Sequence, residues 1–203
     1  IGVRLVGSEM CIRDSWVPVW RRIASFMPSR INGGEPAGLN QRWRLYRYCE
    51  DDIFKLHTDG SWPGSKAREG PNGEGSGVVI RDAYGDRWSQ MTLLLYLDES
   101  YEGGGTSFLV DGAGRPAASP AQPNALMRTV HVPKGGALCF FHGEHPLSLL
   151  HEGSLVTEGT KTIVRSDVLY MLDGAPLPPD DAARTQCSGS GSSSEATNLQ
   201  EDL

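Results

Sequence analysis

The chain has 203 residues, 38% of them hydrophobic, which is enough for one sizeable core but too little for two full domains. Its formal net charge of -6 lies mostly at the end: residues 173–203 hold six acidic residues against Arg184, and residues 16–172 are nearly neutral. A near-neutral body lacks the basic field that nucleic-acid binding requires, and no apolar run approaches the ~20 residues that span a bilayer, so both function classes are set aside.

Both ends of the chain are predicted to lie outside the fold. The string "LVGSEMCIRDS" resembles a translated sequencing adapter, so we interpret residues 1–15 as a scar that replaces the native N-terminus. Residues 174–203 are predicted to be a Pro-rich exit and a disordered acidic Ser/Gly tail, which leaves one domain over residues 16–173. Four cysteines without CxxC spacing favour a reducing, cytoplasmic compartment but do not identify it.

The first element of this domain is predicted to be an amphipathic helix. Apolar residues from Trp16 to Met27 recur at helical spacing in "SWVPVWRRIASFMPS". Pro18 suits the first turn and Pro28 marks the end. This helix is expected to pack on a sheet.

After the helix the hydrophobic period changes to two. Seven or more short strands are predicted, in "QRWRLYRYCE", "DIFKLH", "MTLLLYLDE", "GTSFLV", "RTVHVP", "GALCFF" and "KTIVRSDVLYM". Such a series, separated by Gly, Pro and Asp turns, is typical of an all-β sandwich or barrel. Two long soft loops, 60–77 and 111–126, interrupt it and are predicted to be lids or mobile insertions.

One strand ends in a pair of potential metal ligands. In "FKLHTDGSW", His57 and Asp59 are two positions apart, so an extended backbone projects both side chains to the same side. Two histidines and one carboxylate form the facial triad that binds Fe(II) and leaves positions open for chemistry. An isolated HxD is weak evidence, so the prediction depends on a third ligand.

Four other histidines are available as that third ligand. His131 is predicted to lie on an exposed strand, and His142 and His145 lie in the loop "FFHGEHP", where they could form a small metal pair. His151 opens "LLHEGSLVTEGTKTIVRSDVLY" and is followed ten residues later by Lys161, at the start of a long strand. A histidine and a cation on partner strands suit a metal site beside an anionic cosubstrate.

These motifs together resemble the 2-oxoglutarate- and Fe(II)-dependent dioxygenases of the prolyl 4-hydroxylase type. The resemblance covers roughly residues 39–172 and rests on the order HxD … "HEG..V..G.K", with "TLLLYLDESYEGGGTSFL" and "VPKGGALCFFHG" between. It implies a mainly β fold, a double-stranded β-helix of the jelly-roll or cupin-like kind, with one or more N-terminal helices packed on the major sheet. It also implies Fe(II), 2-oxoglutarate and O2 as cofactors and cosubstrates, with ascorbate in support.

The resemblance carries roles to individual positions. His57, Asp59 and His151 would be the iron ligands and the catalytic residues, and Lys161 would hold the distal carboxylate of 2-oxoglutarate. The same cosubstrate cavity would include the residues Tyr48 and Thr92.

Three further positions stay open. Arg165 lies four residues beyond Lys161 on the same strand face, so it is an alternative or auxiliary ligand for that carboxylate. Arg165 would otherwise contact the substrate or pair with Asp167 to stiffen the barrel wall. Trp62, just past the triad, would cover the site or bind substrate, or simply be an exposed loop aromatic.

The implied reaction is hydroxylation of a C–H bond, coupled to oxidative decarboxylation of 2-oxoglutarate to succinate and CO2. Peptidyl proline is the expected substrate. The alternatives are the same chemistry on a free amino acid, a small metabolite or another protein side chain, or a non-redox cupin-like barrel that binds metal or sugar. Peptide, protein or small-molecule partners are therefore expected, and neither nucleic acid nor membrane.

Overall fold

The computed structural model describes residues 4–5, 16–69 and 75–175. It contains one α-helix, α1 (Trp16–Ile23), and a 3-10 turn, η1 (Ala24–Phe26). The strands are β1 (Arg4–Leu5), β2 (Pro36–Leu39), β3 (Arg44–Cys49), β4 (Phe54–His57), β5 (Lys66–Glu69), β6 (Gly75–Ile80), β7 (Arg87–Tyr96), β8 (Tyr101–Gly103), β9 (Thr106–Val110), β10 (Leu126–Val130), β11 (Ala137–Phe141), β12 (His151–Gly153) and β13 (Val156–Met171). The predicted fold class, mainly β with an N-terminal helix, is confirmed.

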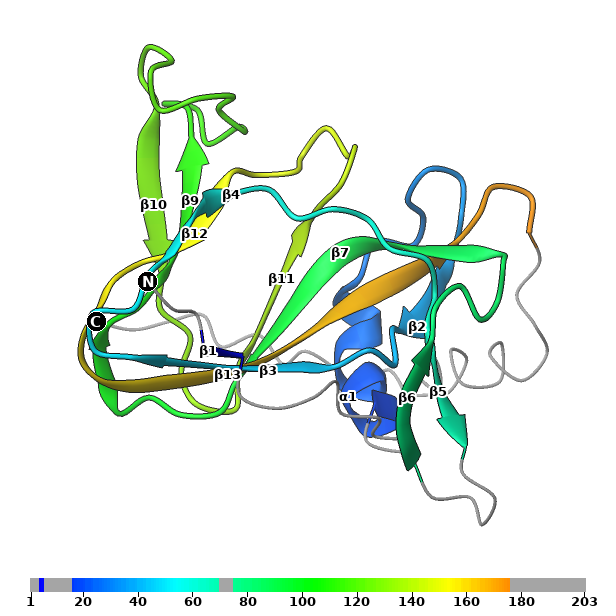
Figure 1. The fold of residues 1–203 in the computed structure, drawn as a ribbon. Helices are drawn as coiled ribbons and strands as arrows, with labels where there is room; N and C mark the ends of the chain where they lie inside the picture. The colour runs from blue at the N-terminus through cyan, green and yellow to red at the C-terminus, as the bar shows by residue number, and fades with distance from the viewer. Residues whose placement is uncertain (1–3, 6–15, 70–74, 176–203) are drawn as a thin grey trace, which may run out of the picture.

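The strands form two main sheets that face each other (Figure 1). The larger sheet runs β1-β3-β13-β7-β11, with β2 and β8 also paired to β13, and the smaller runs β10-β9-β12-β4. Every pairing is antiparallel. The 16-residue strand β13 lies at the centre of the larger sheet, so its side chains reach both of the sheet's faces.

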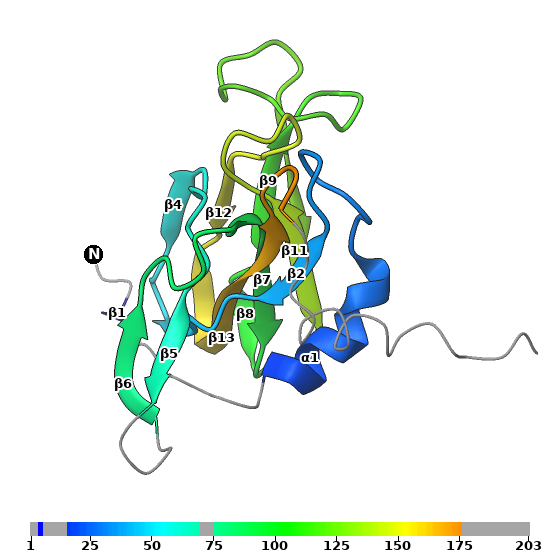
Figure 2. The same ribbon diagram turned by 90° about the vertical axis from the view of Figure 1, so that its right-hand side faces the viewer.

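Alternation along the strands sends neighbouring residues to different cores. On β7, Leu93 packs in the cluster with Trp16 and Trp20 of α1, whereas Leu94 packs in the cluster between the sheets. On β13, the same alternation directs the side chain of Val164 away from the space between the sheets and into the cluster with α1. The helix thus covers the outer face of the larger sheet and lies beside β2 (Figure 2).

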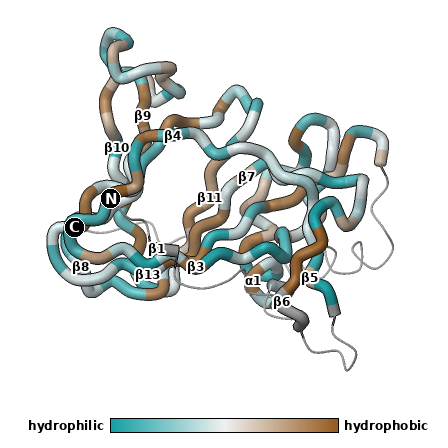
Figure 3. Tube along the Cα trace, viewed as in Figure 1, coloured by the Kyte–Doolittle hydropathy of each residue, from teal (hydrophilic) through white to brown (hydrophobic). Residues whose placement is uncertain are grey.

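The hydropathy of the trace follows this layering. Hydrophobic stretches follow the strands, whereas many of the connecting loops are hydrophilic (Figure 3). On the β5–β6 hairpin, by contrast with most strands, the hydrophobic side chains of Val78 and Ile80 are exposed. No helix in the described part of the chain is long and apolar enough to cross a membrane.

The helix is shorter than predicted. The α conformation ends at Ile23, a 3-10 turn follows, and Met27 is already extended with φ −82° and ψ 145°. The ring of Pro28 explains why Met27 is extended, because proline disfavours the α conformation in the residue before it.

The prediction of an unstructured loop over residues 60–77 was wrong. Within it, β5 pairs with β6 in an antiparallel hairpin that places Lys66 opposite Ile80 and Ala67 opposite Val79. The β-branched run at 78–80 favours this strand, although the Gly- and Pro-rich segment before it obscures the pattern. The other loop, between β9 and β10, contains only turns and an isolated bridge, and its closure over the site stays a prediction.

The predicted chain ends are only partly described. Residues 4–5 of the interpreted scar pair with β3 as β1, while the rest of residues 1–15 and the predicted tail from residue 176 lie outside the described residues. The domain boundaries of 16 and 173 therefore stay predictions.

Candidate metal and anion site

The smaller sheet places two histidines side by side. Strand β4 ends at His57 and strand β12 begins at His151, and these residues are direct partners in the antiparallel pair. Their ring centroids are 4.3 Å apart. Asp59 follows His57 by two residues, and one ligand atom from each of the three residues lies within 4.8 Å of the others. The structure thus brings together the three residues that the sequence motif suggested.

Hydrogen bonds define which nitrogen of each ring faces the centre. His57 Nδ1 lies 2.8 Å from the Lys55 carbonyl oxygen, and His151 Nδ1 lies 3.0 Å from that of Leu149. A carbonyl can only accept, so each Nδ1 carries the proton and each Nε2 keeps its lone pair. Backbone partners of this kind orient the histidine ligands of metal ions.

The two Nε2 atoms face the Asp59 carboxylate without a proton between them. His57 Nε2 is 3.4 Å from Oδ1, and His151 Nε2 is 3.5 Å from Oδ2. His57 Nε2 is buried and has no hydrogen-bond partner. Three acceptors that converge in a buried place are satisfied by a cation, so the residues fit a divalent metal ion.

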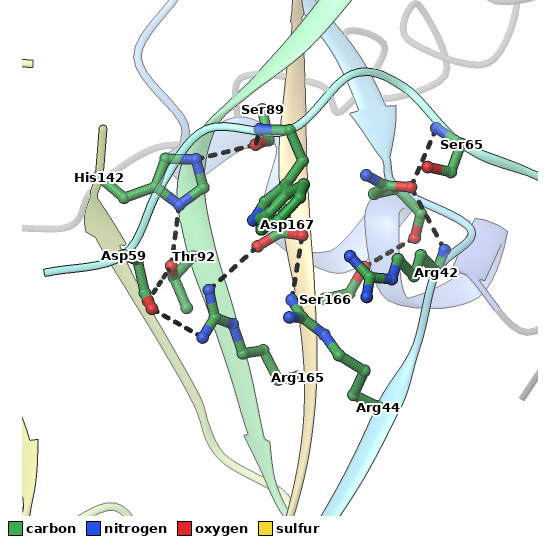
Figure 4. Close-up of polar contacts among 12 residues, drawn as sticks. Arg42, Arg44, Asp59, Ser65, Ser89, Thr92, His142, Arg165, Ser166 and Asp167 are labelled. Atoms are coloured by element: carbon green, nitrogen blue, oxygen red, sulfur yellow. Dashed lines mark hydrogen bonds and ion pairs between the residues drawn. The ribbon is translucent and has the colours of Figure 1, made fainter. Parts of the chain in front are cut away.

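Two other side chains anchor Asp59. It is 6% exposed. Arg165 Nη1 donates to its Oδ1 at 2.7 Å, and the Thr92 hydroxyl donates to its Oδ2 at 2.7 Å (Figure 4). Burial alone would raise the pKa of Asp59, but the positive charge of Arg165 and the hydrogen bonds that the carboxylate accepts hold it well below its usual range. The carboxylate is therefore ionised and held in one orientation.

A cavity of about 400 Å³, including its open mouth, adjoins these ligands between the two sheets. Aromatic and aliphatic side chains form most of its wall, and polar groups occur at a few points. The lining residues are Tyr46, Tyr48, Phe54, His57, Asp59, Leu94, Thr106, Phe140, His151, Glu152, Gly153, Lys161, Ile163 and Arg165.

Lys161 places a cation in this cavity. The side chain is 2% exposed, and its Nζ donates to the Gly104 carbonyl oxygen and lies 5.4 Å and 5.5 Å from the ring centroids of Tyr48 and Tyr96. Among the described residues no carboxylate forms an ion pair with it. Burial lowers its pKa to about 8, against the opposing charge of Asp98. A buried cation with one neutral acceptor is ready to bind an anion.

Arg165 has different partners from Lys161. Besides Asp59, its guanidinium lies 3.7 Å from Asp167 Oδ1, and Arg44 Nη2 lies 3.3 Å from Asp167 Oδ2 (Figure 4). The Arg165–Asp167 proximity that the sequence suggested is therefore present, and the contact with Asp59 is shorter. Arg165 borders the cavity, but two carboxylates already neutralise it.

The other sequence candidates lie in different places. Tyr48 is directly opposite Lys161 in the β3–β13 register, and its ring lines the cavity. Thr92 does not line it, and its hydroxyl is hydrogen-bonded to Asp59. Trp62 is 39% exposed and lies outside the lining, with the Arg42 guanidinium 5.3 Å from its ring centroid.

The alternative metal pair in "FFHGEHP" is not formed. His142 is 1% exposed and hydrogen-bonded on both ring nitrogens, whereas His145 stacks on Phe141 with ring centroids 3.9 Å apart. In the described ranges, only His57, Asp59 and His151 form a potential metal-binding group of three or more. Sequence reasoning missed His142, because nothing local indicates that this loop residue is buried.

No protein-family model matches the sequence, and no curated protein matches it. Solved structures of similar fold include an oxidoreductase of the 2-oxoglutarate-Fe(II) oxygenase family from Burkholderia pseudomallei, with 13% identity, a TM-score of 0.36 and coverage of 66% of this chain and 46% of that one. A Pseudomonas putida prolyl-4-hydroxylase has 17% identity, a TM-score of 0.36 and coverage of 65% and 51%.

A viral collagen prolyl hydroxylase from Paramecium bursaria Chlorella virus-1, in complex with 2-oxoglutarate, has 17% identity, a TM-score of 0.40 and coverage of 77% and 73%. The chain spans about half the length of the two bacterial proteins. These likenesses concern the fold alone.

Proposed function

We propose that this chain is an Fe(II)- and 2-oxoglutarate-dependent dioxygenase that hydroxylates a C–H bond. The observation that supports this most is Lys161, a buried cation without a carboxylate partner among the described residues, in the same cavity as His57, Asp59 and His151. A barrel that only binds metal has no need of such a cation, so Lys161 argues against the non-redox alternative.

Each residue of the site has a distinct part in this proposal. His57, Asp59 and His151 would hold Fe(II), which together with 2-oxoglutarate supplies the O2-activating, oxidising chemistry. Lys161 binds the distal carboxylate of the cosubstrate as a point charge. Burial raises the pKa of Tyr48 above its usual range, so its hydroxyl keeps its proton and remains a hydrogen-bond donor for the same cosubstrate.

The cavity wall limits the access of water. Phe54 and Phe140 stand against the ligand rings, with centroids 4.3 Å from His57 and 4.6 Å from His151, respectively. Leu94 and Ile163 add aliphatic surface. Low polarity strengthens the charge interactions inside the cavity and favours uptake of the anion by Lys161.

The substrate that we propose is a peptidyl proline. This rests on the sequence resemblance, and the partly exposed Trp62 ring, three residues past the cavity-lining Asp59 along the chain, offers an apolar contact for it. Aromatic rings are common docking surfaces for proline-rich peptides. A free amino acid, a small metabolite or another side chain would use the same chemistry.

Turnover with proline-rich peptides tests the proposal. The protein is incubated with Fe(II), ascorbate, 2-oxoglutarate and a peptide library; succinate and added oxygen atoms are measured by mass spectrometry. We expect Fe(II)-dependent succinate formation and hydroxylated proline. Thermal stabilisation by N-oxalylglycine should require metal. If the protein binds metal but does not consume 2-oxoglutarate and does not bind N-oxalylglycine, the result favours the non-redox metal-binding barrel.

Cosubstrate affinity should weaken as the pH rises through about 8. The folded-state pKa of Lys161 is lowered to about 8, so the ammonium is present below that pH and lost above it. We expect the dissociation constant of N-oxalylglycine for the metal-loaded protein to rise about tenfold between about pH 7 and about pH 9. Calorimetry on the wild type and on Lys161→Arg, whose guanidinium keeps its charge, makes the comparison. If the dissociation constant rose equally with pH in the two proteins, the deprotonation of Lys161 would not be its cause.

A further inference from the structure

We propose that His142 is a positioning residue: through Thr92 it fixes the carboxylate of Asp59 in the orientation that binds the metal. This inference rests on the metal site of the proposed function. His142 lies on the loop after β11, is 1% exposed, and has no direct contact with the cavity. Its two ring nitrogens are both hydrogen-bonded, which makes it part of a connected chain of polar groups (Figure 4).

The direction of each hydrogen bond in this chain can be assigned. The ionised Asp59 carboxylate only accepts, so the Thr92 hydroxyl donates to Oδ2 at 2.7 Å. Thr92 Oγ1 has then used its proton, so it accepts from His142 Nδ1 at 2.9 Å. His142 Nε2 accepts from the Ser89 hydroxyl at 2.9 Å, and Ser89 Oγ in turn accepts from the Trp62 amide at 2.9 Å.

Only a neutral His142 with its proton on Nδ1 satisfies all four bonds. Burial lowers the pKa of His142, which agrees with the neutral form. Because every donor points towards Asp59, each bond polarises the next and strengthens it. The other tautomer, with its proton on Nε2, would place the Nδ1 lone pair against the Thr92 oxygen, two acceptors facing each other. A ring turned over by 180° would put carbon atoms at both positions and lose both hydrogen bonds, so the tautomer and the ring orientation are each fixed.

The backbone around His142 reinforces the same connection. The Gly143 amide donates to the Asp59 carbonyl oxygen at 2.9 Å, and the Ser89 amide donates to the Trp62 carbonyl oxygen at 2.8 Å. The chain of bonds therefore joins β7 and the loop after β11 to the segment that begins at Asp59. Thr92 fixes one carboxylate oxygen and Arg165 fixes the other, and only Thr92 depends on His142.

Cobalt(II) binding to the purified protein, without cosubstrate, tests the role. His142→Phe keeps a planar ring and removes both hydrogen bonds, and Thr92→Val removes the hydroxyl at nearly constant volume. We expect each to weaken Co(II) affinity about 10–100-fold and to change the visible absorption of the bound ion, as loss of groups that orient metal ligands does. The double variant should bind like Thr92→Val alone, because His142 acts through Thr92.

Controls separate this role from a merely structural one. Thr92→Ser should retain affinity, His142→Gln should recover part of it, and the exposed His131→Phe should match the wild type. Ser89→Ala, which removes the distal donor, covers the case in which His142→Phe does not fold. Thermal unfolding of the metal-free variants reports stability separately from Co(II) affinity.

Each result decides the matter. Unchanged Co(II) affinity in His142→Phe, or in Ser89→Ala if the former does not fold, overturns the positioning role. The role is also overturned if His142→Phe weakens Co(II) affinity by the same factor in the Thr92→Val protein as in the wild type, because the two effects would then be additive. If the wild type itself binds no Co(II), the metal site of the proposed function is wrong. If the variants lose Co(II) affinity while the wild type lacks 2-oxoglutarate turnover, the positioning role stands and the dioxygenase proposal fails.

Discussion

Replacing Asp59 with alanine should abolish both metal binding and 2-oxoglutarate turnover. The substitution removes the only anionic ligand of the group formed with His57 and His151. Among the described residues, it also leaves Arg165 with the more distant Asp167, at 3.7 Å, as its remaining ion-pair partner. Breaking a buried ion pair on one side costs about 3–5 kcal/mol, so we expect a lower unfolding temperature for the metal-free variant as well.

His57→Ala and His151→Ala should lose turnover in the same way with smaller effects on stability, since neither removes the partner of a buried charge. Bound metal is measured by elemental analysis after dialysis, turnover by succinate formation, and stability by circular dichroism. His131→Ala is the matched control, because its side chain is exposed. A folded Asp59→Ala protein with full activity would show that the site has been placed wrongly.

Replacing Lys161 with methionine should raise the KM for 2-oxoglutarate steeply and leave metal binding intact. Truncating one partner of a buried, hydrogen-bonded charge pair costs about 2–5 kcal/mol, which corresponds to roughly 30-fold to several-thousandfold in affinity. Metal affinity should stay unchanged, since Lys161 is not one of the grouped ligands.

The same substitution should stabilise the protein in the absence of cosubstrate. The pKa of Lys161 is lowered from 10.5 to about 8, so at neutral pH the fold pays about 3 kcal/mol to keep this ammonium charged. Methionine fills a similar volume without a charge. Lower stability together with higher KM would contradict the view that Lys161 is held for its ligand.

Initial rates over a range of 2-oxoglutarate concentrations, with Co(II) titration and thermal unfolding, measure these effects for Lys161→Met and for the exposed control Lys134→Met. An unchanged KM in Lys161→Met would show that Lys161 does not bind the cosubstrate carboxylate. Arg165, the alternative ligand that the sequence left open, would then be the better candidate.

The strand-rich fold class and the spacing of the metal ligands can be predicted from the amino-acid sequence. Period-two alternation predicts strands without knowledge of their partners, because side chains on an extended backbone alternate between two faces. For the same reason, the spacing of His57 and Asp59 gives both side chains a common direction. The β5–β6 hairpin escaped prediction because a Gly- and Pro-rich stretch conceals its β-branched residues.

The polar residues that support the metal ligands are evident only from the folded arrangement of the strands. Thr92, His142 and Arg165 are 33, 83 and 106 positions from Asp59, and none carries a local signal of its role. Arg165 and Lys161 share a face of β13, yet one meets two carboxylates and the other meets a carbonyl oxygen and two aromatic rings. Strand pairing sets these environments, and in a buried site the partner of a charge determines whether it anchors a ligand or remains ready to bind one.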